Sequence, residues 1–147
     1  MHHKDIPLLL ISIRPEFVEE IRSGRKRYEY RKTIFRDADV RRAVIYETMP
    51  VGRVVGEFRI DDVLCMDVDE LWERTKEHSG ISEEFFRSYF RGKEKGYAIE
   101  IGSPRFYGAS ISLKDIPDAP RKPPQSFGYI PSKESLRRKR RPEDNIF

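Results

Sequence analysis

The sequence predicts an α+β protein, namely a small, mostly antiparallel β-barrel of about six strands with one N-terminal helix and a two-helix insertion. Short apolar or alternating segments, each of strand length, recur along the chain. One helical stripe follows the first of them, and a longer helical stretch separates the last strands from the rest. Short strands in this order favour a sheet that curls on itself around one core.

The first half of the chain supplies four strands and one helix. After a continuous apolar run, Arg14 and Pro15 permit a helix with proline at its first position, and Gly24 can end it. The charged segment 33–40 has no period and is expected to be a loop. The strands of this half are predicted at residues 8–13, 27–32, 43–48 and 54–63.

The second half opens with the helical insertion. Asp67 and Glu70 have the spacing of a capping box, and Ser82 can cap a second helix. That second helix carries an aromatic stripe, which we assign to the core and not to a ligand platform. The stripe consists of Phe85, Phe86, Tyr89 and Phe90, and two further strands are predicted at 97–101 and 105–112.

Composition excludes several kinds of site. Cys65 is the only cysteine among 147 residues, which excludes an internal disulfide and a multi-cysteine metal site. Two of the three histidines are adjacent near the N-terminus, so we expect no histidine metal site and no cofactor. The sequence has no apolar run of membrane-spanning length and no apolar stretch typical of a signal peptide. We therefore expect a cytoplasmic protein without a membrane partner, and we assume a monomer.

Charge is unevenly distributed along the chain. Residues 120–147 contain 8 basic and 3 acidic residues, whereas residues 1–119 contain 21 and 22. Within the body, residues 22–42 carry 9 basic and 3 acidic residues, and residues 57–84 carry 3 and 10. The first of these two regions can attract an anion, and the second would repel it.

This distribution suggests three parts. We predict a barrel domain over residues 1–118, a Pro-rich segment over 119–131 that docks through Phe127 and Tyr129, and a basic, disordered tail over 132–147. The tail can attract polyanions, or it can be a solubilising or targeting extension. Its basic run consists of Arg137, Arg138, Lys139, Arg140 and Arg141.

The segment 23–32 concentrates groups that can recognise a nucleotide. Because strand residues alternate between faces, Glu29 and Arg31 share one face, and Tyr28 and Tyr30 share the other. An arginine can hold a phosphate, a glutamate can accept a hydrogen bond from a base amino group, and a ring can stack on a base. An ordinary strand with a salt-bridged, solvated face would show the same pattern, so both interpretations stay open.

The pattern Gly24-x-Lys26-x-x-Glu29-x-Arg31 resembles the motif of the ASCH domain, a branch of the PUA-like β-barrel superfamily. The resemblance covers most of residues 7–129 and ends with a Pro-Pro-Gln-Ser-Phe segment. It implies a PUA-like barrel with a cleft beside the motif and a role in binding RNA or modified nucleobases. The flanking segments that carry it are Ile11–Pro15, Tyr46–Thr48, Val54–Phe58 and Tyr97–Ile101.

We predict that the cleft beside the motif binds RNA or a modified nucleotide, and we favour binding over catalysis. Lys26 and Arg31 would hold phosphate or base oxygens, while Glu29 would accept from a base amino group. The basic tail would add salt-sensitive attraction that does not depend on sequence. The residues expected to line the cleft are Ser12, Tyr46 and Thr48, and those expected to cover it are Gln125, Ser126 and Phe127.

Some small members of the family are amidohydrolases that deacylate N4-acylated cytidine with the motif lysine, a threonine and a helical glutamate. Here Lys26 keeps the lysine position, Glu29 occupies the threonine position, and Glu77 is a candidate for the glutamate. An amidohydrolase with Lys26 as general base is therefore the alternative, and it predicts an enclosed pocket and a lysine of lowered pKa. A third hypothesis is a protein adaptor that presents the Pro-rich segment to a partner.

Overall fold

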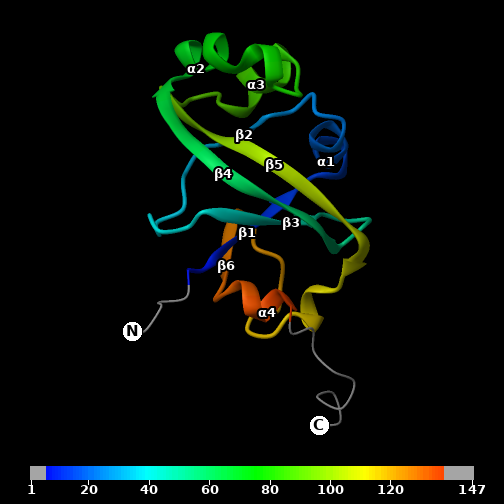
Figure 1. The fold of residues 1–147 in the computed structure, drawn as a ribbon. Helices are drawn as coiled ribbons and strands as arrows, with labels where there is room; N and C mark the ends of the chain where they lie inside the picture. The colour runs from blue at the N-terminus through cyan, green and yellow to red at the C-terminus, as the bar shows by residue number, and fades with distance from the viewer. Residues whose placement is uncertain (1–5, 138–147) are drawn as a thin grey trace.

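The computed structural model describes residues 6–137. Within them it has six β-strands and four α-helices, so the α+β class is confirmed (Figure 1). None of these helices has the length and apolar character that crossing a bilayer requires. The strands are β1 (Leu8–Ile13), β2 (Tyr28–Arg31), β3 (Arg42–Glu47), β4 (Arg53–Asp67), β5 (Lys95–Ile111) and β6 (Phe127–Ile130). The helices are α1 (Pro15–Arg22), α2 (Val68–Thr75), α3 (Glu83–Tyr89) and α4 (Lys133–Arg137), with short 3-10 turns η1 (Lys76–His78) and η2 (Leu113–Asp115).

The six strands form one sheet in the order β2-β5-β4-β3-β1-β6. β1 and β3 are parallel, and the other four pairs are antiparallel, as the prediction of a mostly antiparallel sheet required. The end strands β2 and β6 have four residues each, and over residues 6–137 no ladder joins them. The predicted barrel is therefore not closed by hydrogen bonds, because each short edge strand pairs with one neighbour only.

The long strand β5 corrects one part of the prediction. We expected separate strands at 97–101 and 105–112, and the structure has one strand over Lys95–Ile111. Ser103 takes a positive φ of 46° before Pro104, and the register with β4 shifts there. A β-bulge of this kind bends a strand without ending it, so the Ser-Pro pair marks a bend and not a turn.

The sixth strand lies in the Pro-rich segment, where we expected docking without a strand. β6 pairs with β1 along its whole length, from Phe127 to Ile130. The Tyr129 hydroxyl accepts hydrogen bonds from the backbone N–H groups of Arg36 and Asp37, at 3.1 and 3.4 Å. The segment is thus tied both to the edge of the sheet and to the loop that follows β2.

The structure also differs from the prediction after residue 132. We expected a disordered tail over 132–147, but Lys133–Arg137 form α4. Ser135 is buried, and Leu136 packs against the apolar cluster that contains Ile130. Charge density alone misses this helix because the two side chains that pack are uncharged. The other members of the predicted basic run, Arg138, Lys139, Arg140 and Arg141, lie outside the described residues.

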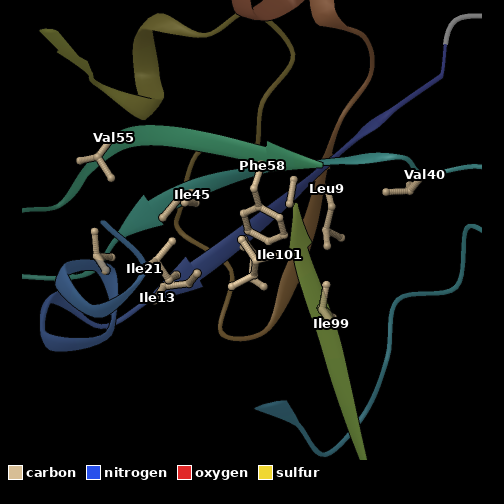
Figure 2. Close-up of a cluster of buried hydrophobic side chains, with 12 residues drawn as sticks. Leu9, Ile13, Ile21, Val40, Ile45, Val55, Phe58, Ile99 and Ile101 are labelled. Atoms are coloured by element: carbon tan, nitrogen blue, oxygen red, sulfur yellow. The ribbon is translucent and has the colours of Figure 1, made fainter. Parts of the chain in front are cut away.

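A cluster of buried apolar side chains fills the space between the sheet and α1 (Figure 2). Phe58 of β4 is fully buried near its centre, and Val18 and Ile21 join it from α1. Truncating such a buried phenylalanine to alanine costs about 3–5 kcal/mol of stability. Because Val18 and Ile21 pack into the same cluster, it also fixes the position of α1. The strand residues of the cluster include Leu9, Ile13, Ile45, Ile99 and Ile101.

The helical insertion covers the other end of the long strands, where β4 runs into α2 (Figure 1). Phe86 of α3 and Phe90, which follows that helix, are fully buried against Tyr30 of β2 and Trp72 of α2. Their rings meet edge-to-face or tilted, with centroids 4.9–6.3 Å apart. The assignment of the stripe to the core is thus right for these two residues, whereas Phe85 is 37% exposed.

Candidate functional site

A cavity of about 380 Å³ opens where β1 and β2 meet α1, α3 and the Pro-rich segment. We call it the motif cavity. Its wall combines the charged groups of the motif with aromatic rings that come from both helices and from β2. The polar side chains lining it are those of Ser12, Arg14, Lys26, Glu29, Arg31, Thr48 and Gln125. The apolar and aromatic ones include Phe17, Tyr30, Ile81, Phe85 and Tyr89.

The backbone brings Lys26 into the cavity wall through two glycines. Gly24, at φ +84°, ends α1, and the N–H of Lys26 then donates to the Glu20 carbonyl at 3.0 Å. The loop after η1 lies directly on Lys26, which forms an isolated bridge with Ser79. A Cβ on Gly80 would lie 2.3 Å from the Lys26 Cβ, and this residue has φ +64°. Gly80 therefore permits the close approach that buries the lysine.

Lys26, Glu29 and Arg31 form a continuous set of ion pairs, which we call the ionic chain. The Arg31 Nη2 lies 2.7 Å from the Glu29 Oε2, and the Lys26 Nζ lies 3.6 Å from the Glu29 Oε1. Their side chains are only 1%, 8% and 11% exposed in chain order. The alternative of a solvated, salt-bridged strand face is therefore half right, since the residues pair but are removed from water.

Burial lowers the pKa of the Lys26 ammonium from its ordinary value of 10.5, and the Glu29 carboxylate opposes part of that shift. The ammonium donates to the Ser79 carbonyl at 3.1 Å and lies 4.9 Å from the centre of the Tyr30 ring. At any given pH, the fraction of neutral amine is thus larger than for an exposed lysine. A neutral amine can accept a proton from a bound molecule.

Arg31 connects the ionic chain to the Pro-rich segment. Its guanidinium donates to the Ser12 carbonyl at 2.7 Å and to the Ser126 carbonyl at 3.4 Å. It also lies 5.3 Å from the centre of the Phe127 ring, and the Ser12 hydroxyl donates to the Pro124 carbonyl at 2.6 Å. We predicted that Arg31 would hold phosphate or base oxygens, and that stays a prediction. The hydrogen bonds that Arg31 makes within the chain brace the segment that carries Gln125 into the wall.

Some of the predicted site residues line the motif cavity, and others lie outside its wall. Tyr46 is buried in a second apolar cluster with Leu10 and Val44 and is not part of the cavity wall. Phe127 contacts Arg31 but does not line the cavity. Its ring packs edge-to-face on Phe35, with centroids 5.8 Å apart. The predicted residues that do line the cavity are Ser12, Lys26, Glu29, Arg31, Thr48 and Gln125.

Other lining residues were not predicted. Phe85 and Tyr89 belong to the aromatic stripe that we assigned to the core, and their spacing of four residues could have indicated a second face of α3. Glu77, the candidate helical glutamate, is exposed in η1 and does not line the motif cavity. Among residues 6–137, no group of three or more His, Cys, Asp or Glu side chains could hold a metal ion.

Comparisons with known proteins agree with this architecture. Residues 11–105 match the ASCH domain family. A Zymomonas mobilis protein named "ASCH domain-containing ribonuclease" is 34% identical over 128 residues, which cover 86% of each protein.

Two crystal structures of ZmASCH, from the same organism, have the same fold as this chain. One contains a serine-to-alanine variant and superposes with a TM-score of 0.79 at 32% identity, over 92% of this chain and 95% of that one. The other contains a tyrosine-to-phenylalanine variant, with a TM-score of 0.77 at 32% identity, over 88% and 93%. This chain therefore belongs to the ASCH domain family.

Proposed function

We propose that this chain binds single-stranded RNA, holds one nucleotide in the motif cavity and cleaves the strand beside it. The observation that carries the proposal is the cavity wall, in which aromatic rings face the buried ionic chain. Proteins recognise single-stranded RNA with rings that stack on bases and with polar groups that bind base edges and phosphates. The cavity volume of about 380 Å³ is within the range of small-ligand sites.

Several polar and aromatic side chains of the cavity wall have their own proposed roles in binding the nucleotide. Tyr89 offers a partly exposed ring for stacking, and Lys26 in its charged form donates to a base or phosphate oxygen. Glu29 accepts from a base amino group, since a carboxylate has about four acceptor positions and its two ion pairs leave others open. Arg31 acts indirectly, because its bond to Ser126 positions the neighbouring Gln125.

Cleavage is supported by the name of the Zymomonas relative, which is a ribonuclease. In our proposal, the neutral amine of Lys26 accepts the proton of the ribose 2′-hydroxyl, and the 2′-oxygen attacks the adjacent phosphorus. The 5′-oxygen of the next nucleotide leaves and takes up a proton. The products are a 2′,3′-cyclic phosphate and a new 5′-hydroxyl end. The lowered pKa of Lys26 suits it to this part.

The decisive experiment compares Lys26→Met with Lys114→Met, which changes an exposed lysine of η2. Each variant is purified in parallel with the unchanged protein and incubated with 5′-fluorescein single-stranded RNA. We expect Lys26→Met to lose cleavage by about 10²-fold or more, as removal of a general base does, and Lys114→Met to keep it. Equal cleavage by all three proteins would contradict the proposal, and mass spectrometry of the ends tests the cyclic phosphate.

Two predicted hydroxyls that do not line the cavity, those of Ser126 and Tyr46, can still be tested for a part in the reaction. The solved ZmASCH variants replace a serine by alanine and a tyrosine by phenylalanine. In this chain, the predicted site residues with such hydroxyls are Ser12, which lines the cavity, and Ser126 and Tyr46, which do not. We expect reduced cleavage from Ser126→Ala and from Tyr46→Phe at an unchanged melting temperature. Full activity in either variant would remove that residue from the site.

A second candidate function is the hydrolysis of an acylated nucleoside. It is favoured by the lowered pKa of Lys26 in a cavity beside Glu29, which this hypothesis predicted. Glu77 offers it no support, because that side chain lies outside the cavity. Turnover of N4-acetylcytidine by the unchanged protein, abolished by Lys26→Met, would establish it. A panel of N4-acylated cytidines left intact would exclude it.

The basic run is proposed to add sequence-independent attraction for RNA. Removing residues 138–147 deletes four of its five positive charges and leaves α4 intact. Each neutralised phosphate contributes about 0.7 to the slope of log affinity against log salt for single strands. We expect the slope measured by fluorescence anisotropy to fall by up to about 3. An unchanged slope would assign the run to solubility or targeting.

A further inference from the structure

We propose that Phe85 and Arg14 form a second base-binding position at the mouth of the motif cavity. Its ligand is the nucleotide next to the one held in the cavity, so that the base stacks on Phe85 and the linking phosphate meets Arg14. The inference rests on the proposed function, because it requires an RNA strand that already has one nucleotide in the cavity.

The Phe85 ring is exposed where its neighbour is not. It is 37% exposed, whereas Phe86, the next residue of α3, is fully buried in the core of the helical insertion. Over residues 6–137, only three other large hydrophobic side chains are as exposed, and none of them lines the motif cavity. The Phe85 ring is therefore not part of the buried core, and it lies at the edge of the motif cavity.

The orientation of the ring leaves room for a base. Phe85 of α3 contacts Phe17 of α1 edge-to-face, with ring centroids 5.2 Å apart and ring planes at 75°. Figure 1 shows the two helices that carry these residues. The Phe17 contact occupies at most one face of the Phe85 ring, and the Arg14 guanidinium also lies over the ring. The part of the ring that remains exposed can stack on a base, and stacking of this kind tolerates any of the four bases.

Arg14 supplies the positive charge beside the ring. Its guanidinium lies 5.9 Å from the centre of the Phe85 ring and 5.5 Å from that of Phe17. The side chain is 60% exposed, and its Nε lies 2.6 Å from a Glu16 carboxylate oxygen. A cation on an aromatic platform matches a nucleotide, which presents a flat base and a phosphate together.

The second position is continuous with the first. Phe17 connects them, because its ring centre lies 5.4 Å from the Lys26 Nζ on the inner side and 5.2 Å from the Phe85 ring on the outer side. All four residues of this path, Arg14, Phe17, Lys26 and Phe85, line the same cavity. A strand whose first base enters the cavity can thus reach Phe85 with its neighbouring base.

The test compares one nucleotide with two. The probes are the four nucleoside 3′-monophosphates and the sixteen 2′-O-methyl dinucleotides, which cannot be cleaved through the 2′-oxygen. Their affinities are measured for the unchanged protein, Phe85→Ala, Phe85→Trp and Arg14→Gln. Met49→Ala and Arg91→Gln serve as matched exposed controls outside the cavity. The melting temperature of each variant verifies that it is folded.

We expect Phe85→Ala to weaken dinucleotide binding about 5- to 100-fold more than it weakens mononucleotide binding. Phe85→Trp should retain or strengthen dinucleotide binding, Arg14→Gln should weaken it, and neither control should change it. If monophosphates bind but Phe85→Ala affects no dinucleotide, the second position is refuted and the proposed function stands. If neither class of probe binds the unchanged protein, both proposals fail.

Discussion

Two arginine–carboxylate pairs on different strands have the same spacing of two residues in the sequence, and one is buried while the other is exposed. Glu29 and Arg31 are alternate residues of β2, and Arg59 and Asp61 are alternate residues of β4. Their N–O distances are 2.7 and 2.5 Å. The β2 side chains are 8% and 11% exposed, whereas those of β4 are 54% and 32% exposed.

Burial, and not charge pattern, therefore distinguishes the ionic chain from a surface pair. Removing two charges from water costs more than their attraction returns unless neighbouring groups complete their hydrogen bonds. Arg31 has such neighbours in the carbonyls of Ser12 and Ser126, and Glu29 has a second cation in Lys26. The β4 pair remains hydrated, and water can replace its contacts at little cost.

The largest expected difference between the two pairs is the loss of stability when the carboxylate of each is replaced by an amide. Glu29→Gln leaves Lys26 and Arg31 as buried cations without their counter-charge, so we expect the free energy of unfolding to fall by about 3–5 kcal/mol. Asp61→Asn is the matched change at the surface and should leave the unfolding midpoint nearly unchanged. Urea titration followed by the fluorescence of the buried Trp72 measures both. Equal effects of the two substitutions would contradict the comparison.

A smaller difference is expected for the arginines. Arg31→Lys keeps the charge but loses the planar fork that reaches two carbonyls, so we expect a loss of about 1.5–3 kcal/mol and a loosened Pro-rich segment. Trypsin should then cut faster after Arg121. Arg59→Lys is the control and should not change the cutting rate. Unchanged protection in Arg31→Lys would show that β6 pairing alone holds the segment.

The smallest expected effect is one of pH. Since the pKa of Lys26 is lowered in the fold, the unfolded chain binds more protons between the two pKa values, and raising the pH toward 10.5 stabilises the fold. The gain is about 1.4 kcal/mol per pH unit within that window. The stability of the unchanged protein should therefore rise with pH relative to Lys26→Met. Parallel pH curves for the two proteins would refute a lowered pKa.

Sequence reasoning located the wall of the motif cavity because the motif is local. Gly24, Lys26, Glu29 and Arg31 lie within eight residues, and the strand period already places the last two on one face. The role of Arg31 could not be predicted, since its bond to Ser126 joins residues 95 positions apart. Contacts of that range leave no periodic signal.

The absence of a local signal for long-range contacts also explains the errors in the predicted fold. The aromatic stripe of α3 has two faces, and its sequence does not say that Phe86 meets the core while Phe85 meets the cavity. Pro104 indicates a strand end locally, but pairing with β4 carries β5 through it as a bulge. The α+β class followed from local patterns, whereas the edges of the sheet were decided by long-range pairing.

Mapping by NMR can show whether RNA occupies the motif cavity. A non-cleavable 2′-O-methyl RNA is titrated into isotope-labelled protein that lacks residues 138–147, so that the basic run cannot dominate binding. We expect the largest amide shifts on Lys26–Arg31, on α3 and around Gln125. Shifts concentrated instead on the separate groove lined by Arg42, Arg105 and Tyr107, with none at Lys26, would contradict occupancy of the motif cavity.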